Sequence, residues 1–277
     1  MSQIPDLPEI QIVDTESMQL HEDIDEARSQ QLVQLLQSQG FLKNPPVVWR
    51  MDSESEKYVV LDGANRTMAV RQIGLPHMLV QIADDAVEVR SWNHILSEGD
   101  MRSFLENVRK INGVNVSQTI EFRAAEAPVR GESLAYMVLP DGETWQLEIV
   151  GESIADKQAC LTELVSLYEG RFRRDRTTAS NMNGLSKLYP DMNCLIVFPQ
   201  FSVDDVVEIA MGGQLLPSGV TRFVISPRAL RMNFPLAMLA DQSPVEDKRL
   251  ALAEWIHQRV EQRRVRFYAE STFVFDE

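Results

Sequence analysis

The fold is decided by the stretch YVVLDGANRTMAVRQIG, residues 58–74. Four residues that favour β structure run into Asp62-Gly63, a pair typical of turns. Apolar residues then recur at roughly helical spacing until Gly74, a residue that commonly ends a helix. The stretch therefore predicts a strand, a tight turn and a short helix.

This junction could bind an anion. A helix that begins directly after a glycine turn points free backbone N–H groups, and the positive end of its dipole, at whatever lies above the turn. Arg66 adds a guanidinium group and Asp62 adds a carboxylate, which suits an anion with a metal or hydroxyl beside it. A simpler interpretation stays open, in which Asp62 caps the helix and Arg66 is a solvated residue of its first turn.

Composition limits the class of protein. The chain has 277 residues, 44% of them hydrophobic, so it can bury a sizeable core. Its 27 basic and 41 acidic residues give a net charge of −14, which opposes binding to nucleic acid and to anionic membranes. A site for a polyanion must therefore be a local basic pocket, and no apolar run approaches the roughly 20 residues that span a bilayer.

Cysteine and histidine patterns favour no metal site. Cys160 and Cys194 stand far apart, and the four histidines lack the spacing of a zinc site. The N-terminus lacks a charged-then-apolar signal pattern, so we expect a reduced, cytoplasmic protein. The common signatures of nucleotide-binding loops, metalloproteases and serine hydrolases are absent.

Periodicity along the chain predicts an α/β (α+β) protein of two domains. Residues 10–83 read as β, α, β, β, α, β. Such a unit of about 75 residues is near the lower limit for folding alone, so we expect a first domain at 1–90 and a second mixed α/β domain, 91–277, packed on it. The second domain is expected to hold a hairpin of strands 134–139 and 145–150, a strand at 194–198, and helices at 101–105, 154–168, from Ser202 or Asp204 to 210, and at 245–264.

A basic cluster interrupts the acidic chain. Residues 171–176, RFRRDR, include four arginines. If this segment is extended, alternation places Arg174 and Arg176 on one side and Arg171 and Arg173 on the other. One side can then face a ligand, and the alternative is a charged surface held by nearby acids.

Two groups of motifs carry a resemblance to a known family. The run LDGANR at 61–66, continuing to GLPH at 74–77, follows HED at 21–23 and KNPPV at 43–47. Together they resemble the ParB/sulfiredoxin-like domain, whose turn commonly reads Asp-Gly-His-His-Arg or Gly-His-Arg-Arg. Within that superfamily the chain is most similar to free L-serine kinases, which form O-phospho-L-serine. The likeness is strongest over 10–83 and extends more weakly to GVTR and RALRMNFPL, which begin at Gly219 and Arg228.

The resemblance implies a small-molecule kinase that transfers a phosphoryl group from ATP or ADP to the hydroxyl of free L-serine, with Mg²⁺, in amino-acid biosynthesis. It implies that Glu22 is the general base, and a carboxylate within reach of a weakly nucleophilic hydroxyl is chemically suited to that role. Asp62 would be catalytic and hold the metal. Phosphate contacts would come from Gly63, Ala64, Asn65, Arg66, Thr67 and Arg176, and substrate contacts from Trp92, His94, Thr221 and Arg222.

The chain departs from the family at Ala64 and Asn65, where histidine is common, and at Phe223, where some members have histidine. Two alternatives follow from the shared turn. A ParB-type nucleotide-binding regulator would bind DNA or a protein without phosphorylating anything, but the charge of −14 and the lack of a helix-turn-helix pattern after residue 83 oppose it. A sulfiredoxin-like thiol repair protein would need a reactive cysteine close to the turn.

Overall fold

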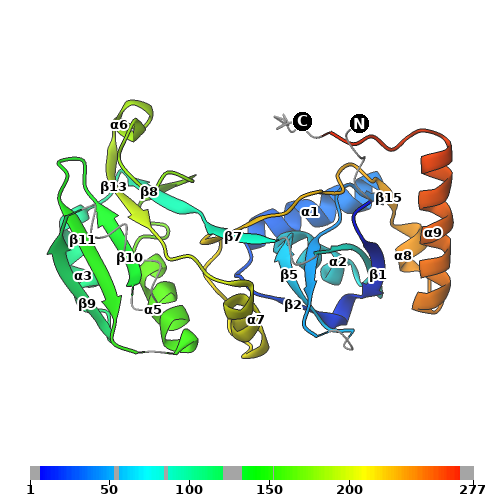
Figure 1. Ribbon diagram of the computed structural model, residues 1–277, viewed down its shortest axis with the longest axis horizontal. Coiled ribbons are helices and arrows are strands. Elements are labelled where there is room, and N and C mark those ends of the chain that lie inside the picture. Colours follow the sequence, from blue (N-terminus) through cyan, green and yellow to red (C-terminus); the bar gives the residue numbers. More distant parts are fainter. Residues whose placement is uncertain (1–6, 53–55, 84–86, 121–132, 152, 269–277) are drawn as a thin grey trace, which may run out of the picture.

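Two lobes lie side by side and are joined by a narrow ribbon of two strands (Figure 1). The computed structural model describes residues 7–52, 56–83, 87–120, 133–151 and 153–268. Within these residues every helix is too short or too polar to cross a membrane. The expected mixed α/β fold is confirmed.

The first lobe is built on a five-stranded sheet in the order β1-β6-β4-β5-β2. Its elements are β1 Ile10–Asp14, β2 Met18–Leu20, α1 Glu26–Gln39, β3 Phe41–Leu42, β4 Val47–Arg50, β5 Tyr58–Asp62, α2 Ala64–Ile73 and β6 His77–Ile82. The predicted strand, turn and helix of residues 58–74 are therefore confirmed. The residues of β5 that favour β structure are almost completely buried, which fits the position of this strand inside the sheet, between β4 and β2.

Glycines end helices α1 and α2. Gly40 follows α1 with a φ of 72° and Gly74 follows α2 with a φ of 79°, the left-handed conformation that residues with a side chain rarely adopt. Each backbone N–H group bonds to a carbonyl of the last helical turn. Gly40 and Gly74, predicted from the sequence to end these helices, do end them.

The second lobe is a six-stranded antiparallel sheet in the order β12-β8-β13-β10-β11-β9. Its elements are β8 Asn93–Ser97, α3 Met101–Val108, β9 Val114–Thr119, β10 Ser133–Val138, β11 Thr144–Ile149, α5 Ile154–Ser166, β12 Arg173–Thr177, α6 Leu185–Leu188, β13 Met192–Val197 and α7 Val203–Met211. The predicted hairpin is β10 and β11. A capping box between Ser202 and Asp205 starts α7 at the first of the two predicted positions.

The chain returns to the first lobe through β14 Thr221–Val224, which pairs antiparallel with β7 Glu88–Ser91. This pair is the ribbon that joins the lobes in Figure 1. The remaining elements are β15 Phe234–Pro235, which pairs with β3, α8 Ala237–Ala240 and α9 Val245–Glu261.

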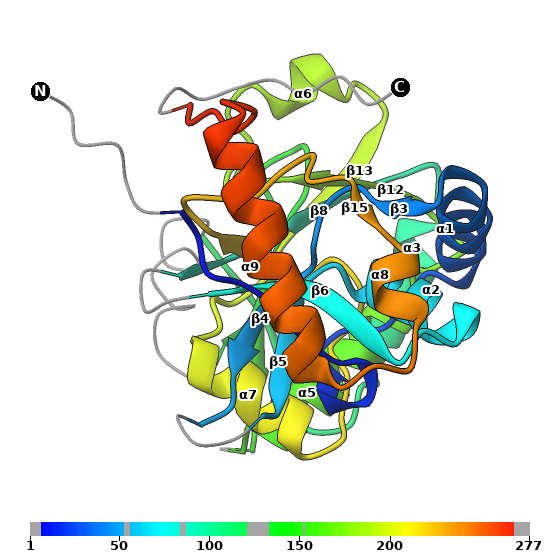
Figure 2. The same cartoon turned by 90° about the vertical axis from the view of Figure 1, so that its right-hand side faces the viewer.

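The last helices pack on the first lobe. Phe234, Leu239 and Leu252 belong to the same buried cluster as β1, β5 and β6, and Figure 2 shows α9 crossing in front of that sheet. The Lys248 ammonium group is buried and donates to the carbonyl oxygens of Leu239 and Asp241, both at 2.7 Å. Residues 234–256, expected within a second domain of 91–277, therefore complete the core of the first lobe.

Candidate active site

The turn between β5 and α2 is shaped by Gly63. Its φ is 101°, and a Cβ atom there would lie 3.0 Å from both the Arg66 Nη2 atom and the Pro46 Cβ atom. Gly63 occupies the cap position, and no side chain caps the helix. The backbone N–H groups of the first turn of α2 therefore have no acceptor within the helix and remain available to an anion.

Asp62 lies between two arginines. Its Oδ2 atom accepts hydrogen bonds from Arg66 Nη2 at 3.1 Å and from Arg228 Nη2 at 2.5 Å. Burial alone would raise the pKa of Asp62, but the two guanidinium groups outweigh burial and hold the pKa below its usual value. Asp62 is therefore an ionised partner of Arg66 and Arg228, and the simpler interpretation of a capping Asp62 is wrong.

Arg66 is held in place on its other side by the loop before β4. Its Nη1 atom donates to the carbonyl oxygens of Asn44, at 2.8 Å, and Pro45, at 3.2 Å. Only 21% of the Arg66 side chain is exposed, so the residue is not a solvated first-turn arginine. Five donors in a fixed fork allow a guanidinium group to make these bonds and still face a ligand.

The other turn residues divide by burial. Ala64 and Thr67 are buried, and the Thr67 hydroxyl donates to the Gly63 carbonyl at 3.1 Å. A nucleotide contact from Ala64 would come from its backbone, whereas the backbone N–H of Thr67 also donates to the Gly63 carbonyl, at 2.9 Å. Asn65 is half-buried, and its Oδ1 atom accepts from the N–H group of Asp25 at 2.9 Å, which ties the start of α2 to the start of α1.

Glu22 is held by a segment far away in sequence. The Glu22 Oε2 atom accepts from the backbone N–H of Gly219 at 3.2 Å, across 197 residues. Two backbone bonds form an isolated β-bridge between Glu22 and Leu216: Leu216 N–H donates to the His21 carbonyl at 2.7 Å, and Asp23 N–H to the Leu216 carbonyl at 2.8 Å. The structure thus brings the predicted general base against the segment that precedes β14.

His21 precedes Glu22 in the chain, and its side chain contacts Thr221 of β14. Its Nδ1 atom is 2.5 Å from the Val60 carbonyl, which can only accept, so Nδ1 carries the proton. Nε2 therefore accepts from the Thr221 hydroxyl at 2.9 Å. Burial lowers the pKa of His21, although the charge of Glu22 opposes this, and the ring is neutral.

Arg222 points away from this contact, because neighbouring residues of a strand face opposite sides. Its guanidinium carbon lies 5.1 Å from the centre of the Trp92 ring. Arg222 also lines a 450 Å³ cavity with Arg90 and Gln200. The structure therefore separates Thr221, beside His21 and Glu22, from Arg222 and Trp92, although all three were expected to contact the substrate.

Arg176 is a member of the basic cluster that interacts electrostatically with Glu22. It lies on β12 against Gly219, where a Cβ atom would be 2.2 Å from the guanidinium group, and its Nη2 atom is 3.5 Å from the Ser218 hydroxyl. Burial lowers the pKa of Arg176, Arg174 lowers it further, and Glu22 raises it. Arg173 instead pairs with Glu98 at 2.6 Å. The predicted extended segment is confirmed for Arg173–Thr177, but Arg171 lies in the turn before β12 and is not part of the alternation.

Sequence reasoning missed two arginines of the site. Arg228 lies in the RALRMNFPL segment, but 166 residues separate it from Asp62, so no spacing indicated the pair. Arg28 lies on the first turn of α1. Burial is the main cause of the lowered pKa of Arg66 and Arg176, and Arg28 lowers both further. Five arginines, at positions 28, 66, 174, 176 and 228, thus make a basic site on an acidic protein.

The thiol alternative has no support among the described residues. Cys160 and Cys194 are both buried and free. Burial raises the pKa of the Cys194 thiol to about 12 and also raises that of Cys160. Neither cysteine has the thiolate character that redox chemistry requires.

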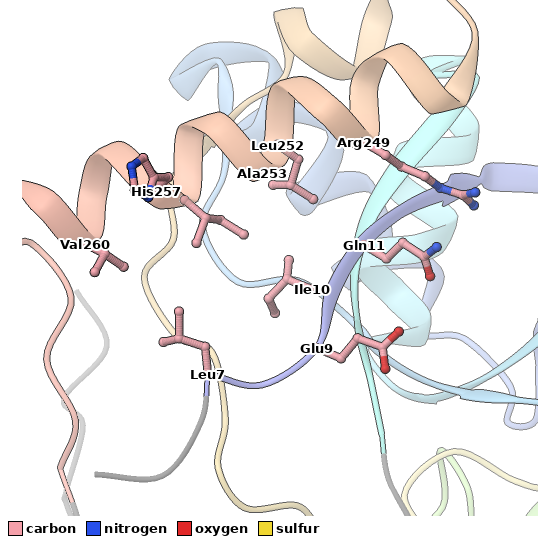
Figure 3. A pocket seen from close by; sticks show the side chains of 10 residues that line it. Leu7, Glu9, Ile10, Gln11, Arg249, Leu252, Ala253, His257 and Val260 are labelled. Carbon is pink, nitrogen blue, oxygen red and sulfur yellow. The ribbon is translucent and has the colours of Figure 1, made fainter.

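A separate groove of 580 Å³ lies between β1 and α9 (Figure 3). Its labelled side chains are mostly apolar and include Leu7, Ile10, Leu252 and Val260. None of the predicted site residues lines it. This groove is therefore separate from the predicted site residues.

The fold is similar to that of solved free serine kinases. No family model matches the chain. The structure superposes on a free serine kinase in complex with AMP with a TM-score of 0.68 and 18% sequence identity, over 83% of this chain and 93% of that one. A C-terminally truncated SbnI of Staphylococcus aureus gives a TM-score of 0.71 and 20% sequence identity, over 92% of this chain and 97% of that one.

Two relatives of similar sequence are named ATP-dependent L-serine kinases. The chain is 24% identical over 241 residues to the ATP-dependent L-serine kinase SbnI of Staphylococcus aureus, which covers 87% of each chain. It is 26% identical over 110 residues to the ATP-dependent L-serine kinase of Staphylothermus marinus, over 39% of this chain and 42% of that protein. The resemblance expected from residues 61–77 is therefore confirmed.

Proposed function

We propose that this protein is an ATP-dependent kinase that phosphorylates the hydroxyl of free L-serine. The observation that carries the proposal is the convergence of Glu22 and the Asp62–Arg66 turn on one C-terminal segment, residues 216–228. In that segment, Gly219 donates a hydrogen bond to the proposed base Glu22, and Arg228 donates one to Asp62 of the proposed phosphate-binding turn. The named relatives, similar over most of the chain, support the same activity.

The phosphates of ATP would lie above the first turn of α2. Free N–H groups, the helix dipole, and the guanidinium groups of Arg66 and Arg228 all favour negative charge there. Phosphoryl transfer depends mainly on positioning and on stabilising the charge of the transferred group. The names of the relatives support ATP as the donor.

Glu22 would act as the general base. The oxygen of the serine hydroxyl bonds to the γ-phosphorus, the bond from that phosphorus to the bridging oxygen breaks, and ADP leaves while the hydroxyl proton passes to Glu22. Gly219 holds one carboxylate oxygen at 3.2 Å and leaves the other for the substrate. Arg176 lies beside Glu22 and is placed to stabilise the charge of the transferred group.

Magnesium suits this site through the nucleotide. Among the described residues no group of three or more His, Cys, Asp or Glu side chains could hold a metal ion. Mg²⁺ commonly needs only one or two protein carboxylates, with phosphates and water as its other ligands, and Asp62 is the carboxylate at the turn. Bound there, Mg²⁺ would neutralise charge on the phosphates.

The test is direct formation of O-phospho-L-serine. Purified protein with ATP, Mg²⁺ and L-serine should give equal amounts of O-phospho-L-serine and ADP by mass spectrometry. L-Alanine, which lacks the hydroxyl, is the matched substrate control. Absence of product with L-serine and with other hydroxy amino acids, under conditions where AMP still binds, would show that the protein is a nucleotide-binding regulator instead.

A further inference from the structure

A second histidine, His94 of β8, reaches the Glu22 segment from the other lobe. The side chain is completely buried. Its Nε2 atom lies 2.9 Å from the Gly219 carbonyl oxygen, and its Nδ1 atom lies 2.7 Å from the Tyr168 hydroxyl. Because the side chain is buried, His94 does not contact a substrate directly, although such a contact was expected from the sequence. Any effect of His94 on the substrate must pass through other residues.

The direction of these hydrogen bonds follows from chemistry. A carbonyl oxygen can only accept, so His94 Nε2 carries the proton and donates to Gly219. Nδ1 must then accept, and the Tyr168 hydroxyl donates to it. Burial lowers the pKa of His94 to about 3 and raises the pKa of Tyr168 well above its ordinary value. Both groups therefore keep these protonation states at neutral pH.

Gly219 links this chain of bonds to Glu22. Its carbonyl oxygen accepts from His94, while its N–H group donates to Glu22. Its φ is 77°, and the Arg176 guanidinium group occupies the space that a Cβ atom would need. The peptide groups on both sides of the Gly219 Cα atom are thus held from two lobes.

We propose that His94 is a positioning residue for the kinase reaction, which orients the Glu22 carboxylate toward the serine hydroxyl by fixing the backbone of Gly219. This inference rests on the proposed role of Glu22 as general base. Tyr168 holds the His94 ring in the required tautomer. The second lobe therefore contributes to the geometry of a base that belongs to the first.

A purely structural role is the competing explanation. His94 also packs edge-on against Phe198, with ring centres 4.9 Å apart, and against Tyr168 at 5.9 Å. A positioning role requires the Nε2 donor, whereas packing requires only the ring. Two substitutions separate these demands: His94→Phe keeps a ring without a donor, and His94→Gln keeps an amide donor near the Nε2 position without the ring.

The kinetic test compares both variants with wild type. Loss of an oriented base should lower kcat of His94→Phe by roughly 10- to 100-fold, with the KM for ATP changed by less than about 2-fold. His94→Gln should retain kcat within about 3-fold of wild type. In a Glu22→Gln background, His94→Phe should cause no further loss, because both changes remove the same function. Equal losses in the Phe and Gln variants, or additive losses with Glu22→Gln, would overturn the proposal.

A second measurement is independent of kinase activity. The amide resonance of Gly219 should shift when Glu22→Gln is introduced into wild type, since the carboxylate accepts from that N–H group. In the His94→Phe background the same substitution should leave the resonance almost unchanged, because Gly219 is no longer held against position 22. A shift of the same size in both backgrounds would overturn the proposal even if the protein proves not to phosphorylate serine.

Discussion

Two guanidinium groups share one carboxylate oxygen of Asp62, and this pairing determines the electrostatics of the turn between β5 and α2, the proposed phosphate site. Such a carboxylate stays ionised and holds the guanidinium groups of both arginines in fixed positions. Arg66 is local to the turn, but Arg228 is supplied by the C-terminal segment. Asp62 is therefore the residue through which the C-terminal segment contacts the proposed nucleotide site.

Arg228→Met tests this arrangement at the residue scale. It removes one cation beside the proposed phosphates and leaves Asp62 with a single partner. The Kd for AMP or ATP, measured by calorimetry, should rise about 10-fold, which is about 1.4 kcal/mol. Arg102→Met, at a side chain that is 90% exposed on α3, is the control and should leave the Kd unchanged. Equal affinity of Arg228→Met and wild type would show that Arg228 serves only Asp62.

Residue types were easier to predict than their partners. Asp62, Gly63 and Arg66 lie within five positions, so local turn chemistry indicated their proximity. Glu22 and Gly219, or Asp62 and Arg228, meet only because the chain returns to the first lobe. The separation of Thr221 from Arg222 could have been predicted, since strand alternation alone sends neighbouring side chains to opposite faces.

At the scale of elements, the return of α8 and α9 to the first lobe depends on one buried cation. Lys248 Nζ donates to the carbonyl of Leu239 in α8 and to that of Asp241, which follows α8, and lies 3.0 Å from the Nδ1 atom of His77 at the start of β6. Buried carbonyl groups without a donor are costly. Hydrophobic periodicity predicted α9 itself, but no pattern in the sequence indicated which sheet it covers.

Lys248→Met removes the donor and keeps most of the aliphatic volume. We expect the free energy of unfolding to fall by about 1–3 kcal/mol, because the buried Leu239 carbonyl, the partly buried Asp241 carbonyl and His77 lose their partner. Urea denaturation measures this, with Lys187→Met on the exposed side of α6 as control. If both variants unfold at the wild-type urea concentration, the buried ammonium group does not hold α9.

Across the whole molecule, three histidines are buried in the neutral state. Burial lowers the pKa values of His21, His77 and His94, and that of His94 to about 3. The unfolded chain then binds more protons than the folded protein at pH values below the ordinary histidine pKa of about 6.5. Stability should therefore be fully present above that value and fall as the pH falls.

The pH dependence of unfolding checks this sign. For His94 alone the expected loss is about 1.4 kcal/mol for each pH unit below about 6.5, since that is the free energy of one pKa unit. The difference in unfolding free energy between wild type and His94→Gln, measured in urea at pH 7.5, 6 and 5, should therefore shrink as the pH falls. A difference that is constant over this range would contradict a neutral, buried His94.

The central claim is that Glu22 and the Asp62 turn form one site for transfer of a phosphoryl group to serine. The most direct measurement is the initial rate of O-phospho-L-serine formation from ATP, Mg²⁺ and L-serine by wild type and by Glu22→Gln, with nucleotide affinity measured in parallel. We predict product from wild type, a rate lower by roughly 100-fold or more in Glu22→Gln, and unchanged AMP binding in both. Equal rates in the two proteins, or no product from wild type, would contradict the account.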